Sequence, residues 1–258
     1  MLQNRIILDK KTHIYTDIET GDTLISWSRF IDNFFHKFDS TIAKKCAGYG
    51  KYAGMTEADV LQAWEDNRNK AADHGTRIHD AIETYSKTFI IEEKNKDLEP
   101  LVMSVKAEHK HYYQIYDEEV LALIDEGIAG TADKIFLLNN RKDSAFDMED
   151  FKTNLSNGVE FVPGEKVKEK WCKYPIDHLP NCSYTKYALQ LSMYAYMFSR
   201  WSRRKPRKLQ IRYIPPEDML QHVVIPVPYL LMEVKALLSE YQLMKSNEKI
   251  NQTNDLIL

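Results

Sequence analysis

The chain has 258 residues, of which 43% are hydrophobic and 28% charged, and its net charge is −3. This is ordinary globular composition, with enough apolar surface for a sizeable core, and it excludes a disordered chain. No stretch approaches the roughly 18 apolar residues that a membrane span needs, and the N-terminus lacks the apolar segment of a signal peptide. The sequence therefore predicts a soluble cytoplasmic protein without membrane contacts.

The cysteines and the charge pattern restrict the possible sites. Cys46, Cys172 and Cys182 are widely spaced, which predicts neither a disulfide framework nor a zinc site. With a negative net charge, a nucleic-acid surface must come from local clusters of cations. The clearest cluster covers 200–208 and includes Arg203 and Arg204. It is either a nucleic-acid contact or a solvated helix end, where cations complement the helix dipole.

The first part of the chain is expected to form a small β-meander and then helices. Apolar and polar residues alternate near the N-terminus, and Gly21-Asp22 supplies a turn. A helix capped by Ser28 should follow, because five apolar residues recur at helical spacing, namely Phe30, Ile31, Phe34, Phe35 and Phe38. Thr56 and Asp59 have the spacing of a capping box. Gly75 is expected to separate that helix from the next one.

The second part reads as strands and helices in alternation. A helix is expected over 98–116, and strands over 118–124, 128–138 and 145–153, with a polar turn at 139–143. A polar insertion (154–183) precedes a helix over 184–201, and strands over 208–214 and 221–226 lead to a closing helix over 228–244. This order predicts an α/β (α+β) fold with a central mixed sheet of about 4–6 strands flanked by helices.

Two aspartates interrupt neighbouring apolar strands. Asp133 lies in the strand 128–138, where a buried carboxylate is unfavourable unless it is paired or bound to metal. In the next strand, Asp150 and Lys152 share a face because strand side chains alternate with period two, and Glu149 points the other way. The alternative is a surface ion pair between Asp150 and Lys152 and a turn position for Asp133.

The other interpretation of Asp133, Asp150 and Lys152 is a hydrolytic metal site. Two aspartates on adjacent antiparallel strands can converge on Mg²⁺ or Mn²⁺, which prefer oxygen ligands, and the Phe151 carbonyl can add a ligand. Lys152 can orient or help deprotonate an attacking water and stabilise the negative charge that develops on a phosphate. Asp133, Asp150 and Lys152 are therefore the predicted catalytic residues.

Four motifs resemble those of PD-(D/E)xK nucleases, in particular the RecB-like and lambda-exonuclease-like branch that includes phage and mitochondrial genome-maintenance exonucleases. They are Gly75-Thr76-Arg77-Ile78-His79 with Glu83, then Gly130-Thr131-Ala132-Asp133, Asp150-Phe151-Lys152-Thr153 and Gln190-Leu191-Ser192-Met193-Tyr194. They occur in family order and span 75–194. The resemblance implies a restriction-endonuclease-like core over 75–246, an N-terminal meander and helical arch over 1–74, and a loose tail over 247–258.

The resemblance also assigns roles to single residues. Asp133, Asp150, the Phe151 carbonyl and His79 would bind one or two Mg²⁺ or Mn²⁺ ions, although His79 can also be a core histidine. Glu83 would bind metal through water or hydrogen-bond the histidine. Gln190 and Tyr194 would touch substrate or brace the catalytic strand. The cysteines do not suit an iron–sulfur cluster, and no nucleotide-binding P-loop is present.

The function that follows is cleavage of DNA. The resemblance favours a metal-dependent exonuclease acting on single-stranded or duplex ends in phage-type recombination, replication or repair, with a protein partner of that process, in the bacterial host cytoplasm if a phage encodes it. Lysines around Trp171 in the insertion suit phosphate contacts or a solvated loop. A structure- or sequence-selective endonuclease and a non-catalytic DNA-binding scaffold remain alternatives.

Overall fold

The computed structural model describes residues 5–36, 40–142, 144–153 and 171–255, the last eight of these by their backbone alone. Eight strands form one sheet: β1 (Ile6–Asp9), β2 (Ile14–Asp17), β3 (Thr23–Ser26), β4 (Gln114–Leu123), β5 (Ile128–Leu137), β6 (Ala145–Lys152), β7 (Lys205–Tyr213) and β8 (Val223–Val227). The α-helices are α1 (Trp27–Ile31), α2 (Ile42–Cys46), α3 (Glu57–Thr88), α4 (Glu99–His109), α5 (Ser183–Ser202) and α6 (Leu231–Asp255). None of them, within the described ranges, has the length and apolarity to cross a membrane.

The α/β class with a mixed, helix-flanked sheet is confirmed, but the sheet is larger than the 4–6 strands expected. Its order is β1-β2-β3-β5-β6-β7-β8, with β4 paired to β5. The N-terminal meander does not form a separate unit, because β3 pairs in parallel with β5 through Ile25 with Ile128 and Ser26 with Ala129. Periodicity reveals a strand but not its distant partner, which is why the meander could not be added to the sheet from sequence.

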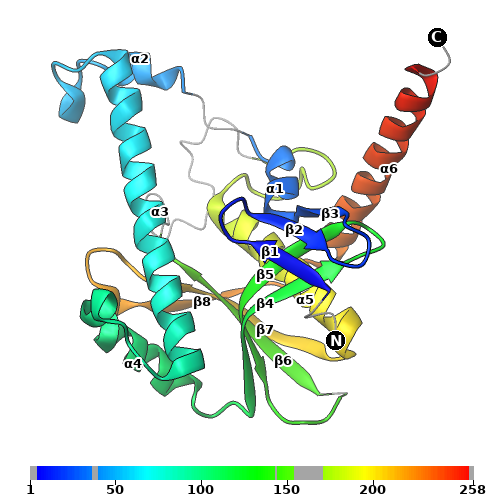
Figure 1. Cartoon of the computed structure of the whole chain (residues 1–258). Helices are drawn as coiled ribbons and strands as arrows, with labels where there is room; N and C mark the ends of the chain where they lie inside the picture. The colour runs from blue at the N-terminus through cyan, green and yellow to red at the C-terminus, as the bar shows by residue number, and fades with distance from the viewer. Residues whose placement is uncertain (1–4, 37–39, 143, 154–170, 256–258) are drawn as a thin grey trace.

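Helices cover both faces of the sheet (Figure 1). Alternation along β6 sends Phe146 and Met148 into a core shared with α1, α5 and α6, whereas Phe151 packs with α3 and α4. The insertion contributes to the first core, since Cys172 and Ile176 are buried there. Each face of β6 is therefore covered by a different set of helices.

The helix α3 runs without a break through Gly75 and through the expected boundary at 74/75, so the expected separation at Gly75 is wrong. The capping box predicted at its start is present, with Thr56 and Asp59 bonded reciprocally. Gly75 serves a close contact instead, because a Cβ there would lie 2.9 Å from the Thr153 side-chain oxygen. The glycine lets α3 approach the end of β6.

Three other boundaries differ from expectation. The helix expected from Ser28 is only five residues long, with Ser26 as its N-cap, and Phe38 lies outside the described residues. The helix expected over 98–116 ends at His109, and the next four residues lead into β4. The tail expected from 247 is helical as far as Asp255, where no glycine or proline interrupts the helix.

The face of β6 turned toward α4 carries a buried network of charges. Glu149 is fully buried and accepts hydrogen bonds from Arg212 Nε (2.8 Å) and Gln210 Nε2 (2.6 Å), and its Oε1 lies 3.1 Å from His109 Nε2. Burial raises the pKa of Glu149, but the bonds to His109 and Arg212 more than offset this and hold it at about 2. The ionised carboxylate therefore ties β6 to β7 and α4.

Replacing Glu149 by Gln should destabilise the fold by about 3–5 kcal/mol at neutral pH, because it leaves the Arg212 guanidinium buried without its counter-charge. The folded pKa lies below the ordinary value, so this stability is present above about pH 4.5 and is lost as the pH falls towards 2. Urea denaturation measures the free energy of unfolding of both proteins. The difference between wild type and variant should fall by about 2 kcal/mol from pH 6 to pH 3. Glu65→Gln, which loses an exposed ion pair to Arg68, should leave the midpoint unchanged; a difference independent of pH would contradict the assignment.

Candidate active site

Asp133 and Asp150 face each other where the β5–β6 ladder ends. Lys134 pairs with Glu149 in the antiparallel register, so Asp133 and Asp150 are next in line and share the other face. Asp133 Oδ2 accepts the backbone N–H of Phe151 at 2.7 Å. The two aspartates therefore line the same cavity.

Lys152 forms an ion pair with Asp150 on the same face of β6. The Asp150 side chain is 2% exposed and the Lys152 side chain 18%. Burial lowers the pKa of Lys152, but the carboxylates of Asp150 and Asp133 more than offset this and raise it above its ordinary value. The ammonium group is therefore charged beside these two carboxylates.

His79 projects from α3 toward the two strands. Its Nδ1 lies 3.6 Å from Asp133 Oδ2, and its Nε2 lies 3.2 Å from the carbonyl oxygen of Phe151. Burial lowers the pKa of His79, but Asp133 and Glu118 more than offset this and raise it to about 9. The imidazole is thus protonated beside these acceptors, and a cation held by its nitrogen must first displace that proton.

Glu118 joins this cluster and was not among the residues singled out from sequence. Its Oε1 lies 3.9 Å from His79 Nδ1, and single ligand atoms of Glu118, His79 and Asp133 all lie within 4.8 Å of one another. Asp117 pairs with Lys134 and Glu119 with Ala132, which sets Glu118 across from Asp133. Its φ of 51° departs from strand geometry, a strain of about 1–3 kcal/mol that recurs at functional sites.

The sequence contained only a weak signal for Glu118. It stands in the acidic run Asp117-Glu118-Glu119, and the strand was expected to begin at 118, so the residue was read as a strand end. The observed strand starts four residues earlier, at Gln114, and only this longer register brings Glu118 opposite Asp133.

The carboxyl of Asp150 is held in an unfavourable environment. Its pKa is raised to about 6 by burial and by the nearby Asp133, although Lys152 opposes the shift. The ligand atoms of Asp133, Glu118 and His79 lie within 4.8 Å of one another, and Asp150, which is not in that group, lines the same cavity. Carboxylate oxygens suit a hard divalent cation, which would relieve the repulsion at Asp150. The residues present therefore fit the expected Mg²⁺ or Mn²⁺.

The helix α5 closes the site from the other side. Gln190 Nε2 donates to the hydroxyl of Tyr194 at 3.2 Å, and the Tyr187 ring centre lies 4.9 Å from Lys152 Nζ. Tyr194 is buried against β5, where a Cβ at Gly130 would lie 2.2 Å from its ring. Gly130 is thus needed for this packing, and Tyr187 contacts the predicted catalytic lysine.

Three of the predicted binding residues lie outside the cluster of His79, Glu118 and Asp133. Glu83 lines the same cavity but is paired with Lys10 (3.0 Å) and Lys87. Arg203 and Arg204 lie at the opposite end of the sheet, because β7 runs parallel to β6 from Lys205 beside Ala145 to Tyr213 beside Lys152. Arg204 is buried and donates to the carbonyl of Asn139 at 3.1 Å. Neither arginine joins the cluster.

A cavity of about 530 Å³ opens over these residues. Its walls come from the meander, α1, α3, the middle of β4 and β5, the end of β6, and α5. Lys10 and His13 of the β1–β2 turn and Arg68 of α3 add cationic or titratable groups to its lining. Within the insertion, Lys173 is bonded to the carbonyl of Asn33, and 154–170 lie outside the described residues.

The chain has only distant similarity to known proteins. No protein-family profile and no curated protein matches the chain. Some solved structures do. A candidate exonuclease from Eubacterium rectale is 15% identical, covers 82% of this chain and 79% of its own, and has a TM-score of 0.34. An alkaline exonuclease from Laribacter hongkongensis is 10% identical, and the match covers 89% of this chain and 99% of that one, with a TM-score of 0.34. TM-scores this low do not support a functional assignment, so the proposed function rests on this chain's own residues.

Substituting Gly130 by Ala should destabilise the protein by about 1–3 kcal/mol, because the added methyl overlaps the Tyr194 ring and forces it to move. Urea denaturation measures the loss. In a Tyr194→Ala background the same substitution should cost much less, since the ring is gone, and the double-mutant cycle isolates that contact. Equal losses in the two backgrounds would show that the ring is not the obstacle.

Proposed function

We propose that the protein is a metal-dependent nuclease that hydrolyses phosphodiester bonds in DNA. The observation that carries this proposal is the convergence, in one cavity, of Asp133, Asp150, His79 and Glu118 with the charged Lys152. A site that merely stabilises the fold does not need two carboxylates beside a lysine with an open cavity above them. The cavity gives a substrate access to the buried charges.

The residues of the site are proposed to have different roles in hydrolysis. Asp133 and Asp150 would hold the cation together with His79, Glu118 and the Phe151 carbonyl. A divalent ion supplies Lewis-acid polarisation of the phosphate and a lowered pKa of bound water. Lys152 adds fixed positive charge where negative charge grows on the phosphate, and burial strengthens this effect.

The substrate proposal rests on resemblance together with the divalent ion. Three cationic side chains line the cavity against five carboxylates, and Lys10 is paired with Glu83, so a bound divalent cation would be needed to attract the phosphate backbone of DNA. The motifs resemble those of exonucleases, so we propose cleavage from single-stranded or duplex ends. Gln190 and Tyr194 are proposed to brace the strand or touch the substrate.

The biological setting is proposed from the resemblance alone. The proposed ion is Mg²⁺ or Mn²⁺, and the proposed partner is a recombination or replication protein. The enzyme would act in the bacterial host cytoplasm during phage-type recombination, replication or repair. An endonuclease on the same core is the second candidate, since the site itself does not distinguish a DNA end from an internal bond.

End-labelled linear DNA should be degraded in Mg²⁺ or Mn²⁺ and left intact in EDTA, whereas covalently closed circles should resist. Asp150→Asn and Lys152→Ala should each lower the rate at least about a hundredfold, because the first removes a charged ligand of the cation and the second removes positive charge beside the reacting phosphate. Gel analysis of product length over time measures the rate and separates stepwise from internal cleavage.

The matched control is Lys205→Ala, which removes an exposed cation at the opposite end of the sheet and should keep full activity. Cleavage in EDTA, or full activity of both site variants, would refute the mechanism. Cleavage of closed circles would assign an endonuclease. Binding without cleavage of either substrate would make the chain a DNA-binding scaffold.

Glu118→Gln should weaken Mn²⁺ binding by at least about tenfold, because it removes one negatively charged ligand atom from the cluster. Isothermal titration with Mn²⁺ measures the affinity. Asp80→Asn removes the same charge from the lining of the same cavity but not from the ligand set, and should change the affinity by less than about threefold. If the two variants lose equally, Glu118 acts through the general field and not as a ligand.

A further inference from the structure

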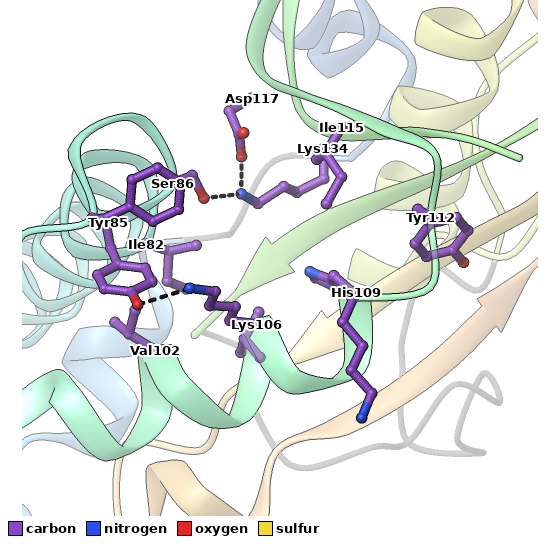
Figure 2. Close-up of a pocket in the computed structure, with 13 residues that line it drawn as sticks. Ile82, Tyr85, Ser86, Val102, Lys106, His109, Tyr112, Ile115, Asp117 and Lys134 are labelled. Atoms are coloured by element: carbon purple, nitrogen blue, oxygen red, sulfur yellow. Dashed lines mark hydrogen bonds and ion pairs between the residues drawn. The ribbon is translucent and has the colours of Figure 1, made fainter. Parts of the chain in front are cut away.

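A second cavity of about 520 Å³ lies on the opposite face of β4 and β5 from the candidate active site, between the last turns of α3 and the helix α4 (Figure 2). Neighbouring residues divide between the two cavities. Asp133 and Glu118 line the first, while Lys134 and Asp117 line the second, because successive strand side chains point to opposite faces. The two cavities are therefore back to back.

Aromatic and aliphatic side chains form much of its lining. Tyr85 and Phe89 come from α3, and Tyr112 lies stacked on Phe136 with ring centres 4.4 Å apart and planes 19° from parallel. Ile82 and Val102 add aliphatic surface. Phe89 is 70% exposed, which is unusual for a phenylalanine, and its ring lies at the rim in edge-to-face contact with Tyr85. A flat aromatic ligand matches this lining.

Cations supply the other half of the lining. Lys106 Nζ donates to the Tyr85 hydroxyl at 2.9 Å and lies 4.7 and 5.0 Å from the ring centres of Tyr85 and Phe89. Lys134, buried in the opposite wall, donates to Ser86 at 2.8 Å and is paired with Asp117. Figure 2 shows these two ammonium groups reaching inward from α4 and β5.

The charge of the cavity is positive overall. Lys110 is the third lysine of the lining and Asp117 its single carboxylate, so the formal balance, with histidine neutral, is three positive charges to one negative. Lys106 and Lys110 lie one turn apart on the exposed side of α4 and at its end, where solvent reaches them. An anionic group entering the cavity would meet these two lysines first.

We propose that this cavity binds a nucleotide, with the base against Tyr85, Phe89 or Tyr112 and the phosphate at Lys106 and Lys110. A ligand without a ring would leave the aromatic lining unused, and one without an anion would leave the lysines unused. Stacking on aromatic side chains beside lysines is how single strands are held without sequence preference. That the nucleotide belongs to a DNA strand rests on the proposed function; the other source of the same chemistry is a free nucleoside monophosphate.

Photocrosslinking in EDTA tests the proposal with two probes, 5-iodo-2′-deoxyuridine 5′-monophosphate and a 12-nucleotide single strand carrying one 5-iododeoxyuridine. Mass spectrometry should find the adduct on Tyr85, Phe89 or Tyr112. Lys106→Glu/Lys110→Glu should lower the yield at least about tenfold and reduce the salt dependence of strand binding by about 0.7 per lost phosphate contact. The matched control Arg141→Glu/Lys142→Glu reverses two exposed cations of the β5–β6 turn, outside this cavity, and should crosslink like the wild type.

The outcomes separate this proposal from the nuclease activity. Adducts only on residues of the first cavity, or a yield unchanged by the double reversal, would overturn the second site even if DNA is cleaved. Adducts in the second cavity with both probes, without any cleavage in Mg²⁺, would refute the nuclease and keep the nucleotide site. An adduct with the monophosphate alone would assign the cavity to free nucleotides, and with the strand alone to DNA.

Discussion

Buried charge on β6 is the constraint on which the rest of the structure depends. Asp147, Glu149 and Asp150 are each at most 1% exposed, and an isolated carboxylate at that depth is strongly unfavourable. Partners must therefore come from other elements, and the strand β7 supplies most of them. Arg207 pairs with Asp147, and Arg212 pairs with Glu149. The parallel packing of β7 on β6 is thus required by charge as well as by the apolar core.

Alternation along the strand then separates a structural charge from a chemical one. Glu149 and Asp150 are adjacent and equally buried, yet their pKa values move in opposite directions, to about 2 and about 6. Burial raises both, but Glu149 has an arginine and a histidine as hydrogen-bond partners, whereas Asp150 has one lysine and faces the carboxylate of Asp133. A cation would supply the charge that Asp150 lacks, which is why the unfavourable group marks the site.

The sequence revealed what local periodicity can reveal. The strands that carry Asp133, Asp150 and Lys152, and the capping box at Thr56, follow from patterns within a few residues. Features that depend on distant partners could not be obtained this way. Gly75 looked like a helix break because glycine lowers helix propensity, but its missing side chain is what lets α3 meet Thr153. Glu118 became visible only through its pairing register with β5.

The position of α3 fixes the geometry of both cavities. His79 and Glu83 on one side of the helix line the first cavity, and Ile82 and Ser86 on the next side line the second. A displacement of α3 would move the lining residues of both cavities together, since these residues are neighbours on a single rigid helix. Bulk at Gly75 would therefore push His79 from Asp133 and also draw Ser86 from Lys134. Close contact between α3 and the catalytic strand is one requirement that serves both sites.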